Sequence, residues 1–139
     1  IHTGVRLSKS SDLLPSETCR GIWNSRAQPK RFFWLPVAEN EKIHSRIIVR
    51  HYNEFDNKEK NDTKLILKLY SAKNFEIRET LTNSSILSNG AELNSLFDDA
   101  KTFLGNSYGW LTIFSEYAYF DITTTMENEH GSISYEHSF

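Results

Sequence analysis

The stretch RIIVRHYNEFDNKEKNDTKLILKLY, residues 46–70, decides the fold prediction because it holds two segments in which apolar and polar residues alternate. Apolar residues at every second position are typical of a β-strand with one buried face. The connection between them, residues 53–62, is mostly charged or amide-bearing and is too long for a tight turn. The stretch therefore predicts two antiparallel strands joined by a protruding loop. The alternating apolar positions in and just before it are Ile43, Ile47, Val49, Leu65, Leu67 and Leu69.

The segments on either side extend this predicted sheet. RFFWLPV, residues 31–37, is rich in aromatic residues and contains a proline, which suits an edge strand or a strand end. NFEIRETL, residues 74–81, predicts a strand with Phe75, Ile77 and Leu81 turned inward. Together with the two central strands, these segments predict an antiparallel meander of about four strands.

Residues 89–105 carry a helical pattern. Apolar residues recur there at intervals of three and four, Asn89 with Glu92 resembles a capping box, and Gly105 stands where a C-terminal cap belongs. A shorter helix is expected from Pro15, which opens a stretch with apolar residues at helical spacing. The apolar stripe of the longer helix consists of Leu93, Leu96, Phe97, Ala100 and Leu104.

The last part of the chain returns to strand. GWLTIFSEYAYFDITTT, residues 109–125, alternates, and its even positions Trp110 and Phe114 are expected in the core. A bulge or bend near residues 115–117 is expected to divide this run into two shorter strands. SISYEHSF, residues 132–139, closes the chain as a final strand.

The order of these elements predicts an α+β fold. Its main part is a curved antiparallel sheet of about six to seven strands, with the amphipathic helix and the short N-terminal helix packed on one face. The alternative is a closed β-barrel of about eight strands with the helix as a plug. Residues 1–14 are expected to form a flexible arm and residues 15–139 a single domain, because 139 residues support one core.

Composition excludes several functional classes. A formal net charge of -2 and a pI near 6.2 give no overall field that would attract nucleic acid or an anionic membrane. Cys19 is the only cysteine, which excludes an internal disulfide and a zinc site of cysteines alone. No apolar run approaches the roughly 20 residues that span a bilayer. The chain lacks P-loop, dinucleotide-binding and HExxH motifs, so neither a cofactor nor a metal site is predicted.

The outward positions of the predicted meander collect basic side chains and tyrosines. Such a surface suits an acidic protein, a phosphate or single-stranded nucleic acid, because cations pair with anions and tyrosine rings stack on bases. The opposing interpretation is an ordinary solvated sheet face whose lysines discourage edge pairing. The candidate partner-binding residues are Arg46, Arg50, Tyr52, Lys64, Lys68, Tyr70, Arg78, Tyr117 and Tyr119.

These observations favour a non-catalytic protein-binding or regulatory module that uses the basic strand face, the 53–62 loop or the outward tyrosines. Another protein is the preferred partner, nucleic acid is a less favoured one, and the oligomeric state and compartment stay open. A second hypothesis is a small hydrolase or nuclease in which His51, His130 or His137 acts with Glu129. A third is an apolar-ligand-binding β-barrel domain whose cavity would be lined by Phe33, Trp34, Phe97, Phe103 and Trp110.

Overall fold

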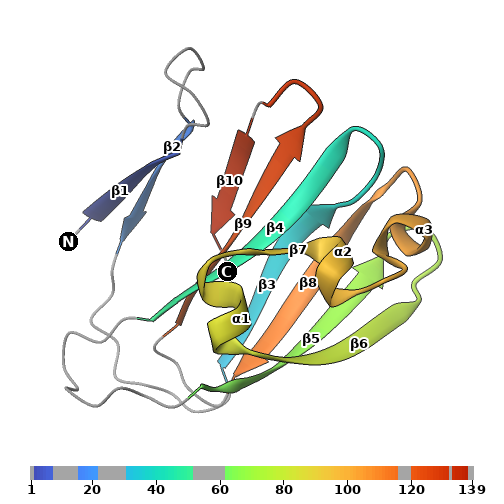
Figure 1. Cartoon of the computed structure of the whole chain (residues 1–139), viewed down its shortest axis with the longest axis horizontal. Helices are drawn as coiled ribbons and strands as arrows, with labels where there is room; N and C mark the ends of the chain where they lie inside the picture. The colour runs from blue at the N-terminus through green and yellow to red at the C-terminus, as the bar shows by residue number, and fades with distance from the viewer. Residues whose placement is uncertain are drawn as a thin grey trace.

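A computed structural model gives the fold for part of the chain. It describes the backbone of residues 2–7, 16–21, 31–51, 62–115, 120–131 and 133–137, and the side chains of residues 34–49, 62–114 and 122–131. Within these ranges the chain is mainly antiparallel β-structure with a few short helices (Figure 1). The strands are β1 (His2–Leu7), β2 (Ser16–Gly21), β3 (Arg31–Ala38), β4 (Ile43–His51), β5 (Lys64–Ser71), β6 (Ile77–Asn83), β7 (Ala91–Glu92), β8 (Tyr108–Ser115), β9 (Phe120–Asn128) and β10 (Ile133–His137). The helices are α1 (Ser84–Ser88), α2 (Leu93–Leu96) and α3 (Ala100–Leu104).

Two four-stranded antiparallel sheets form the body of the described structure. The strand order is β3-β8-β5-β6 in the first sheet and β10-β9-β4-β7 in the second sheet. The strands β1 and β2 pair with each other as a separate hairpin. In the described part of the chain neither four-stranded sheet closes on itself, so the barrel alternative is wrong.

The predicted meander is also wrong, because β4 leaves the first sheet. It pairs with β9 over its whole length and with β7, whereas β8 occupies the place between β3 and β5. Of the meander contacts, only the β5–β6 hairpin forms as predicted. Alternation reports that one face of a strand is buried, but it carries no information about which strand lies beside it.

Hydrogen bonds of Ser45 hold the corner at which the chain passes from the first sheet to the second. The Ala38 N–H donates to Ser45 Oγ at 2.9 Å, and the Ser45 hydroxyl donates to the Ala38 carbonyl at 2.7 Å. In the connection itself, Asn40 Oδ1 accepts hydrogen bonds from the N–H groups of Lys42 and Ile43 at 2.8 and 3.0 Å. This turn chemistry lets β4 start a new sheet directly after β3 ends.

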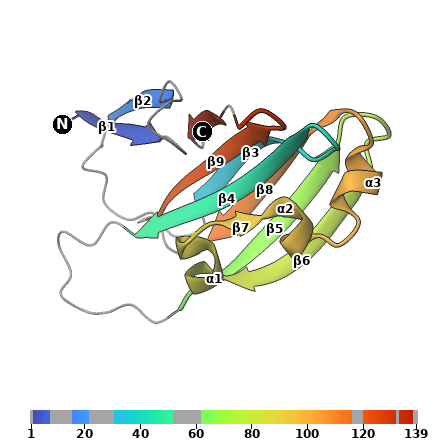
Figure 2. The ribbon, with the colours of Figure 1, turned by 45° about the horizontal axis from the view of Figure 1, so that its top comes forward.

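The two sheets enclose one hydrophobic core together with residues 84–104, which contain α1, β7, α2 and α3 and are called the helical segment. Figures 1 and 2 show β7, α1 and α2 over the same side of the first sheet. From the first sheet the buried core residues are Leu35, Val37, Leu65, Leu67, Leu69, Leu111 and Ile113. From the second sheet and the helical segment they are Ile47, Val49, Leu87, Ala91, Leu93, Phe97, Ala100, Phe103, Leu104 and Ile122.

The helix predicted over residues 89–105 is broken into shorter pieces. Its first part, Ala91–Glu92, forms β7 on the edge of β4, and Phe97 adopts an extended conformation between α2 and α3. Strand pairing and burial of Phe97 therefore override the helical periodicity of the sequence. The apolar stripe is nevertheless buried, with Leu96 partly so, and Gly105 ends α3 with a φ of 62° as its position predicted.

The short helix predicted from Pro15 is wrong as well. Residues Ser16–Gly21 form β2, which pairs antiparallel with β1, His2–Leu7, inside the segment expected to be an arm. An isolated helix of this length is marginal in water, and a glycine weakens it further. Pairing with β1 instead gives the backbone of β2 a complete set of ladder partners on one side.

Gly109 allows α3 to pack closely on β8. A Cβ atom at this position would lie 2.4 Å from Cδ2 of Leu104 and 2.6 Å from the carbonyl oxygen of Tyr70.

We expect Gly109→Ala to lower the free energy of unfolding by about 1–3 kcal/mol, because the backbone of β5 and a buried side chain must both move. Urea denaturation measures the change. The control is Asn106→Ala, at an exposed position in the connection between α3 and β8, expected within about 0.5 kcal/mol of wild type. Equal effects of the two substitutions would contradict this packing.

Hydrogen bonds of Asp62 connect the start of α1 to the residues that precede β5. Its carboxylate accepts hydrogen bonds from the Ser85 N–H at 2.8 Å, the Ser85 hydroxyl at 2.7 Å and the Ser84 hydroxyl at 3.2 Å. The hydrogen bond from the Ser85 N–H, helped by those from the hydroxyls, lowers the pKa of Asp62 below the ordinary aspartate value. The ionised carboxylate therefore stabilises the folded state.

Asp62→Asn is expected to reduce the pH dependence of stability. Because the pKa is lowered on folding, the contribution of Asp62 is fully present above its unfolded-state pKa and is lost as the pH falls through its folded-state pKa. The gap in unfolding free energy between wild type and Asp62→Asn should therefore shrink below about pH 4. Urea denaturation at a series of pH values measures this gap. Ser85→Ala keeps the N–H donor and should give a smaller gap, and a gap independent of pH would refute the assignment.

Candidate binding surface

The predicted partner-binding residues do not share one surface. Arg46 lies on β4 in the second sheet, whereas Lys64, Lys68 and Tyr70 lie on β5 in the first sheet. Arg78 is on the edge strand β6, on the side of the sheet that faces the helical segment. The remaining candidates, Tyr52, Tyr117, Tyr119 and the side chain of Arg50, lie outside the described residues.

Most of the described cations in this set are neutralised by carboxylates of the same chain. Arg46 Nε donates to Glu92 Oε1 at 2.9 Å across the β4–β7 pair. Lys68 Nζ lies 2.9 Å from Glu79 Oε2 across the β5–β6 pair, and this hydrogen bond raises the pKa of Lys68 above its ordinary value. Lys64 is exposed at the start of β5. The described residues therefore do not form a continuous basic face.

Arg78 is held by two kinds of contact. Its Nε donates to Asp99 Oδ2 at 3.0 Å, and its NH1 group lies 3.5 Å from Glu76 Oε2. The guanidinium carbon also lies 4.4 Å from the centre of the Phe103 ring, which is a cation–π distance. The hydrogen bond to Asp99 raises the pKa of Arg78 above its ordinary value. These contacts fix Arg78 over the helical segment rather than over the sheet edge.

The outer face of the first sheet carries an exposed aromatic cluster. The ring centroids of Trp34 and Trp110 are 5.2 Å apart at an interplanar angle of 73°, an edge-to-face contact. Trp34 is 41% exposed and Trp110 is 46% exposed, although each belongs to a strand whose other face is in the core. We call this surface the aromatic face. Strand register assigns to it Trp34, Pro36, Ile66, Lys68, Tyr70, Ile77, Glu79, Leu81, Trp110, Thr112 and Phe114.

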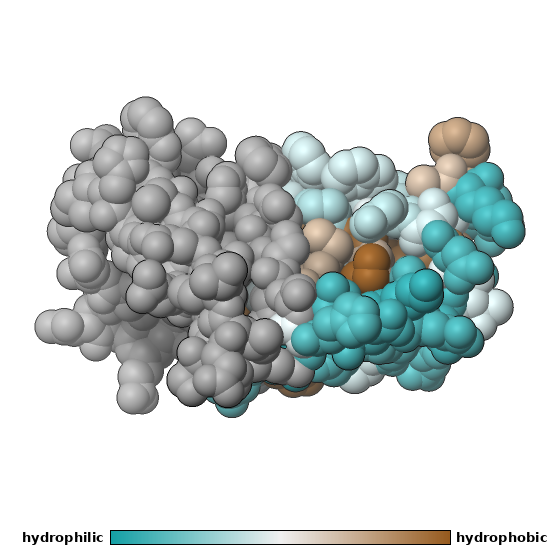
Figure 3. All heavy atoms as spheres, turned by 90° about the horizontal axis from the view of Figure 1, so that it is seen from above, coloured by the Kyte–Doolittle hydropathy of each residue, from teal (hydrophilic) through white to brown (hydrophobic). Residues whose placement is uncertain are grey.

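The register arranges the aromatic face in three rows that run across the strands. The first row is Pro36, Trp110, Tyr70 and Ile77. The second row is Trp34, Thr112, Lys68 and Glu79. The third row contains Phe114, Ile66 and Leu81. Two apolar rows thus flank a row that contains the Lys68–Glu79 ion pair. Seen from above, the molecule also exposes apolar side chains that lie among hydrophilic ones (Figure 3).

The structure reverses the predicted orientation of β8. Trp110 was expected in the core, but Leu111 and Ile113 are fully buried instead, and Phe114 is only partly buried. Both sets of alternating residues in this strand are apolar, so alternation alone does not identify the buried set. The polar residue Thr112 shares the phase of Trp110 and is the one sequence signal that this phase faces outward.

The predicted inward residues of β6 are likewise exposed. Ile77 is 50% exposed, Leu81 is 69% exposed, and Phe75 stands in the preceding turn with a φ of 58°. The core side of this strand is taken by Arg78 and by Thr80, whose neighbours are the helical segment and β5. The outer side of this edge strand therefore presents exposed aliphatic side chains.

The alternative hypotheses can be placed on the same structure. Of the residues proposed to line a ligand cavity, Trp34 and Trp110 lie on the aromatic face, whereas Phe97 and Phe103 are buried on the other side of the sheet. These four side chains do not line one cavity. Of the histidines, His130 is exposed in a turn, 3.5 Å from Glu129. The side chains of Phe33, His51 and His137 lie outside the described residues.

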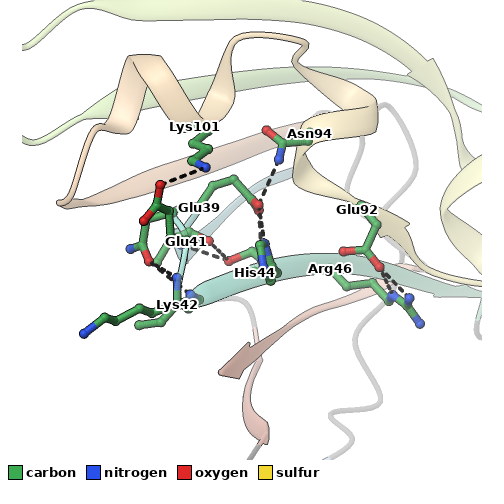
Figure 4. A network of polar contacts seen from close by, with 12 residues as sticks. Glu39, Glu41, Lys42, His44, Arg46, Glu92, Asn94 and Lys101 are labelled. Atoms are coloured by element: carbon green, nitrogen blue, oxygen red, sulfur yellow. Dashed lines mark hydrogen bonds and ion pairs between the residues drawn. The ribbon is translucent and has the colours of Figure 1, made fainter. Parts of the chain in front are cut away.

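Figure 4 shows a polar network around the buried carboxylate of Glu39. Glu39 Oε1 accepts hydrogen bonds from His44 Nδ1 at 2.7 Å and from Asn94 Nδ2 at 2.9 Å, and Oε2 accepts one from the Ser45 N–H at 3.2 Å. The side chain of Glu39 is 2% exposed. Because donors from β4 and α2 meet at this carboxylate, Glu39 joins the β3–β4 corner to the helical segment.

The described residues contain neither a metal-binding cluster nor a membrane-spanning helix. No cluster of three or more histidine, cysteine, aspartate or glutamate side chains is placed there to hold a metal ion. No helix in the described part of the chain is long and apolar enough to cross a membrane.

Comparisons with protein-family models, with curated proteins and with solved structures find no match to this chain.

Replacement of Glu39 tests the network. Glu39→Gln puts an NH2 donor where the structure has an acceptor, so at least one of the three donors loses its partner. We expect the free energy of unfolding to fall by about 1–3 kcal/mol in urea denaturation. The matched control is Glu41→Gln in the same turn, because Glu41 is 84% exposed and lies 3.7 Å from Lys101 Nζ. That control should stay within about 0.5 kcal/mol of wild type. A neutral Glu39→Gln would show that the carboxylate does not hold the corner.

Proposed function

We propose that this protein is a non-catalytic binding module whose aromatic face docks an apolar patch of another protein. The observation that carries the proposal is the pair of half-exposed tryptophans, Trp34 and Trp110, packed edge to face on the outside of a sheet. Tryptophan and tyrosine are enriched among the residues that dominate binding energy at protein interfaces. Tyr70, adjacent to Trp110 in the same row, adds a third ring. The predicted basic face contributes Lys68 to this surface but not Arg46.

The chemistry of the aromatic face favours a protein over a sugar. A sugar ring stacks on a flat aromatic platform and needs hydrogen-bonding groups around it, but the two indoles are inclined at 73°. The side chains beyond them on the edge strand, Ile77 and Leu81, are aliphatic and exposed. Exposed apolar side chains that lie next to one another mark surfaces that bind other proteins.

The same surface is poorly suited to nucleic acid. Its central cation, Lys68, already has Glu79 as a partner, and Arg78 and Arg46 are paired elsewhere. A formal net charge of -2 supplies no compensating attraction for phosphates. A partner that docks here is therefore expected to bring an apolar surface with a small number of charges.

Truncation of the tryptophans tests this function. The wild-type chain is used to isolate a partner from its source, and the affinity of the purified partner is then measured by titration calorimetry. Trp110→Ala is expected to weaken binding by at least about thirtyfold, because loss of a central interface tryptophan removes about 2 kcal/mol or more. Trp34→Ala should act in the same direction.

Two control variants locate the effect. Ile86→Ala removes an exposed apolar side chain from α1, away from the aromatic face, and should leave the affinity unchanged. Arg46→Ala tests the second sheet in the same way. Circular dichroism melting establishes that each variant is folded. Unchanged binding by both tryptophan variants, or loss of binding in Arg46→Ala alone, would contradict the assignment to the aromatic face.

A further inference from the structure

Among the described strands, β6 is an edge strand of the first sheet. In the described part of the chain it pairs with β5 alone. The Ser71 N–H donates to the Glu76 carbonyl at 3.2 Å, which makes the pair before Tyr70–Ile77 a hydrogen-bonded one. Because such pairs alternate along an antiparallel ladder, Arg78 and Thr80 direct their main-chain groups toward β5. The N–H and C=O groups of Ile77, Glu79 and Leu81 therefore point away from the sheet.

The side chains of the same outward residues lie at the ends of the rows of the aromatic face. Ile77 and Leu81 are exposed, and Glu79 stands between them. Glu79 Oε2 lies 2.9 Å from Lys68 Nζ. A carboxylate accepts several hydrogen bonds at once, so Glu79 can take a second cation on the free side of β6.

The strand β5 shows which side chains suit the aromatic side of β6. Directly opposite Ile77, Glu79 and Leu81 it presents an aromatic residue, a lysine and an aliphatic residue. These residues are Tyr70, Lys68 and Ile66. A strand on the other side of β6 meets the same three side chains and is favoured by the same cross-strand chemistry.

We propose that the free edge of β6 binds an extended segment of another protein as a fifth strand of the first sheet. The segment would carry a basic residue opposite Glu79, with apolar residues two positions before and two positions after it. Main-chain hydrogen bonds would supply affinity and the alternating side chains specificity, as in other cases of strand addition. The inference rests on the proposed function, because the added strand would widen the aromatic face that docks the partner.

The edge of β6 carries neither proline nor lysine, two residues that commonly protect sheet edges. The sequence of β6, IRETLTN, contains no proline, and its only cation, Arg78, is held over the core side by Asp99 and Phe103. Glu79, the remaining charged residue, is the one that the proposed partner would neutralise.

A second copy of this chain fits the edge less well than a basic segment. Antiparallel self-pairing centred on Thr80 would place Glu79 opposite Leu81, and pairing centred on Glu79 would place two carboxylates opposite each other. Pairing centred on Leu81 would place Glu79 opposite Asn83. None of these arrangements supplies a cation to Glu79, so we assign the edge to a different chain.

A designed peptide tests the inference without a known partner. The probe is a blocked peptide of sequence TVTKTVT, in which the two valines lie two positions before and after the lysine. The matched peptide, TVTETVT, has glutamate in place of the lysine. Nuclear magnetic resonance titration of the whole protein should show binding of the lysine peptide at least about tenfold tighter than of the glutamate peptide. Amide exchange should slow at Ile77, Glu79 and Leu81, the residues whose N–H groups point outward.

Two variants keep the test decisive. Leu81→Pro removes an outward N–H while leaving the bonds to β5 in place, so the protein should fold but lose the lysine peptide. The charge exchange Lys68→Glu with Glu79→Lys keeps the ion pair within the chain and should reverse the peptide preference. Equal binding of both peptides, or binding that Leu81→Pro leaves unchanged, would overturn the inference. A dimer in sedimentation that Leu81→Pro abolishes would also overturn the inference, because it would place a second copy of the chain on the edge.

The peptide result is independent of the aromatic-face test. If partner binding depends on Trp110 and no peptide binds at β6, the edge inference fails and the binding module stands. If the peptide binds as described and Trp110→Ala leaves the partner unaffected, the aromatic face is refuted and β6 alone is the site.

Discussion

The insertion of β8 between β3 and β5 determines both faces of the first sheet. Its register places Leu111 in line with Leu35 and Leu69, and these fully buried side chains fix which side of the sheet faces the core. Since successive side chains of a strand point to opposite faces, the same register forces Trp34 and Trp110 to the outside, where they meet. A shift of one residue would bury the indoles and expose the leucines. The aromatic face is thus a consequence of how the core is filled.

The corner between β3 and β4 has an equal effect on topology. With the Ser45 hydroxyl bridging the main chain of Ala38 and the Glu39 carboxylate gathering donors from β4 and α2, the chain is directed out of the first sheet. The place beside β3 is then open for β8, and β4 becomes the central strand of the second sheet. A buried carboxylate with all of these donors satisfied favours one arrangement of the corner over others.

The sequence was informative about local structure and much less so about partners in the sheets. Alternation located the strands around Ile47 and Leu67, and the apolar stripe from Leu93 to Leu104 identified residues that are indeed buried. The sequence pattern did not reveal that residues 91–92 pair with β4. The reason is that a short strand and the start of a helix can have the same composition. Orientation failed where both faces of a strand are apolar, as in β8. The candidate residues were chosen because their side chains are basic. Their expected position on one common face depended on the predicted meander, which β4 does not join.

The measurement that most directly tests the central claim is the solvent accessibility of the ring protons of Trp34 and Trp110, before and after the partner binds. A soluble paramagnetic probe broadens the resonances of protons that it can approach. We predict that the ring-proton signals of both indoles broaden in the free protein and are protected in the complex. Indole signals that are already shielded in the free protein, or that still broaden equally in the complex, would contradict it.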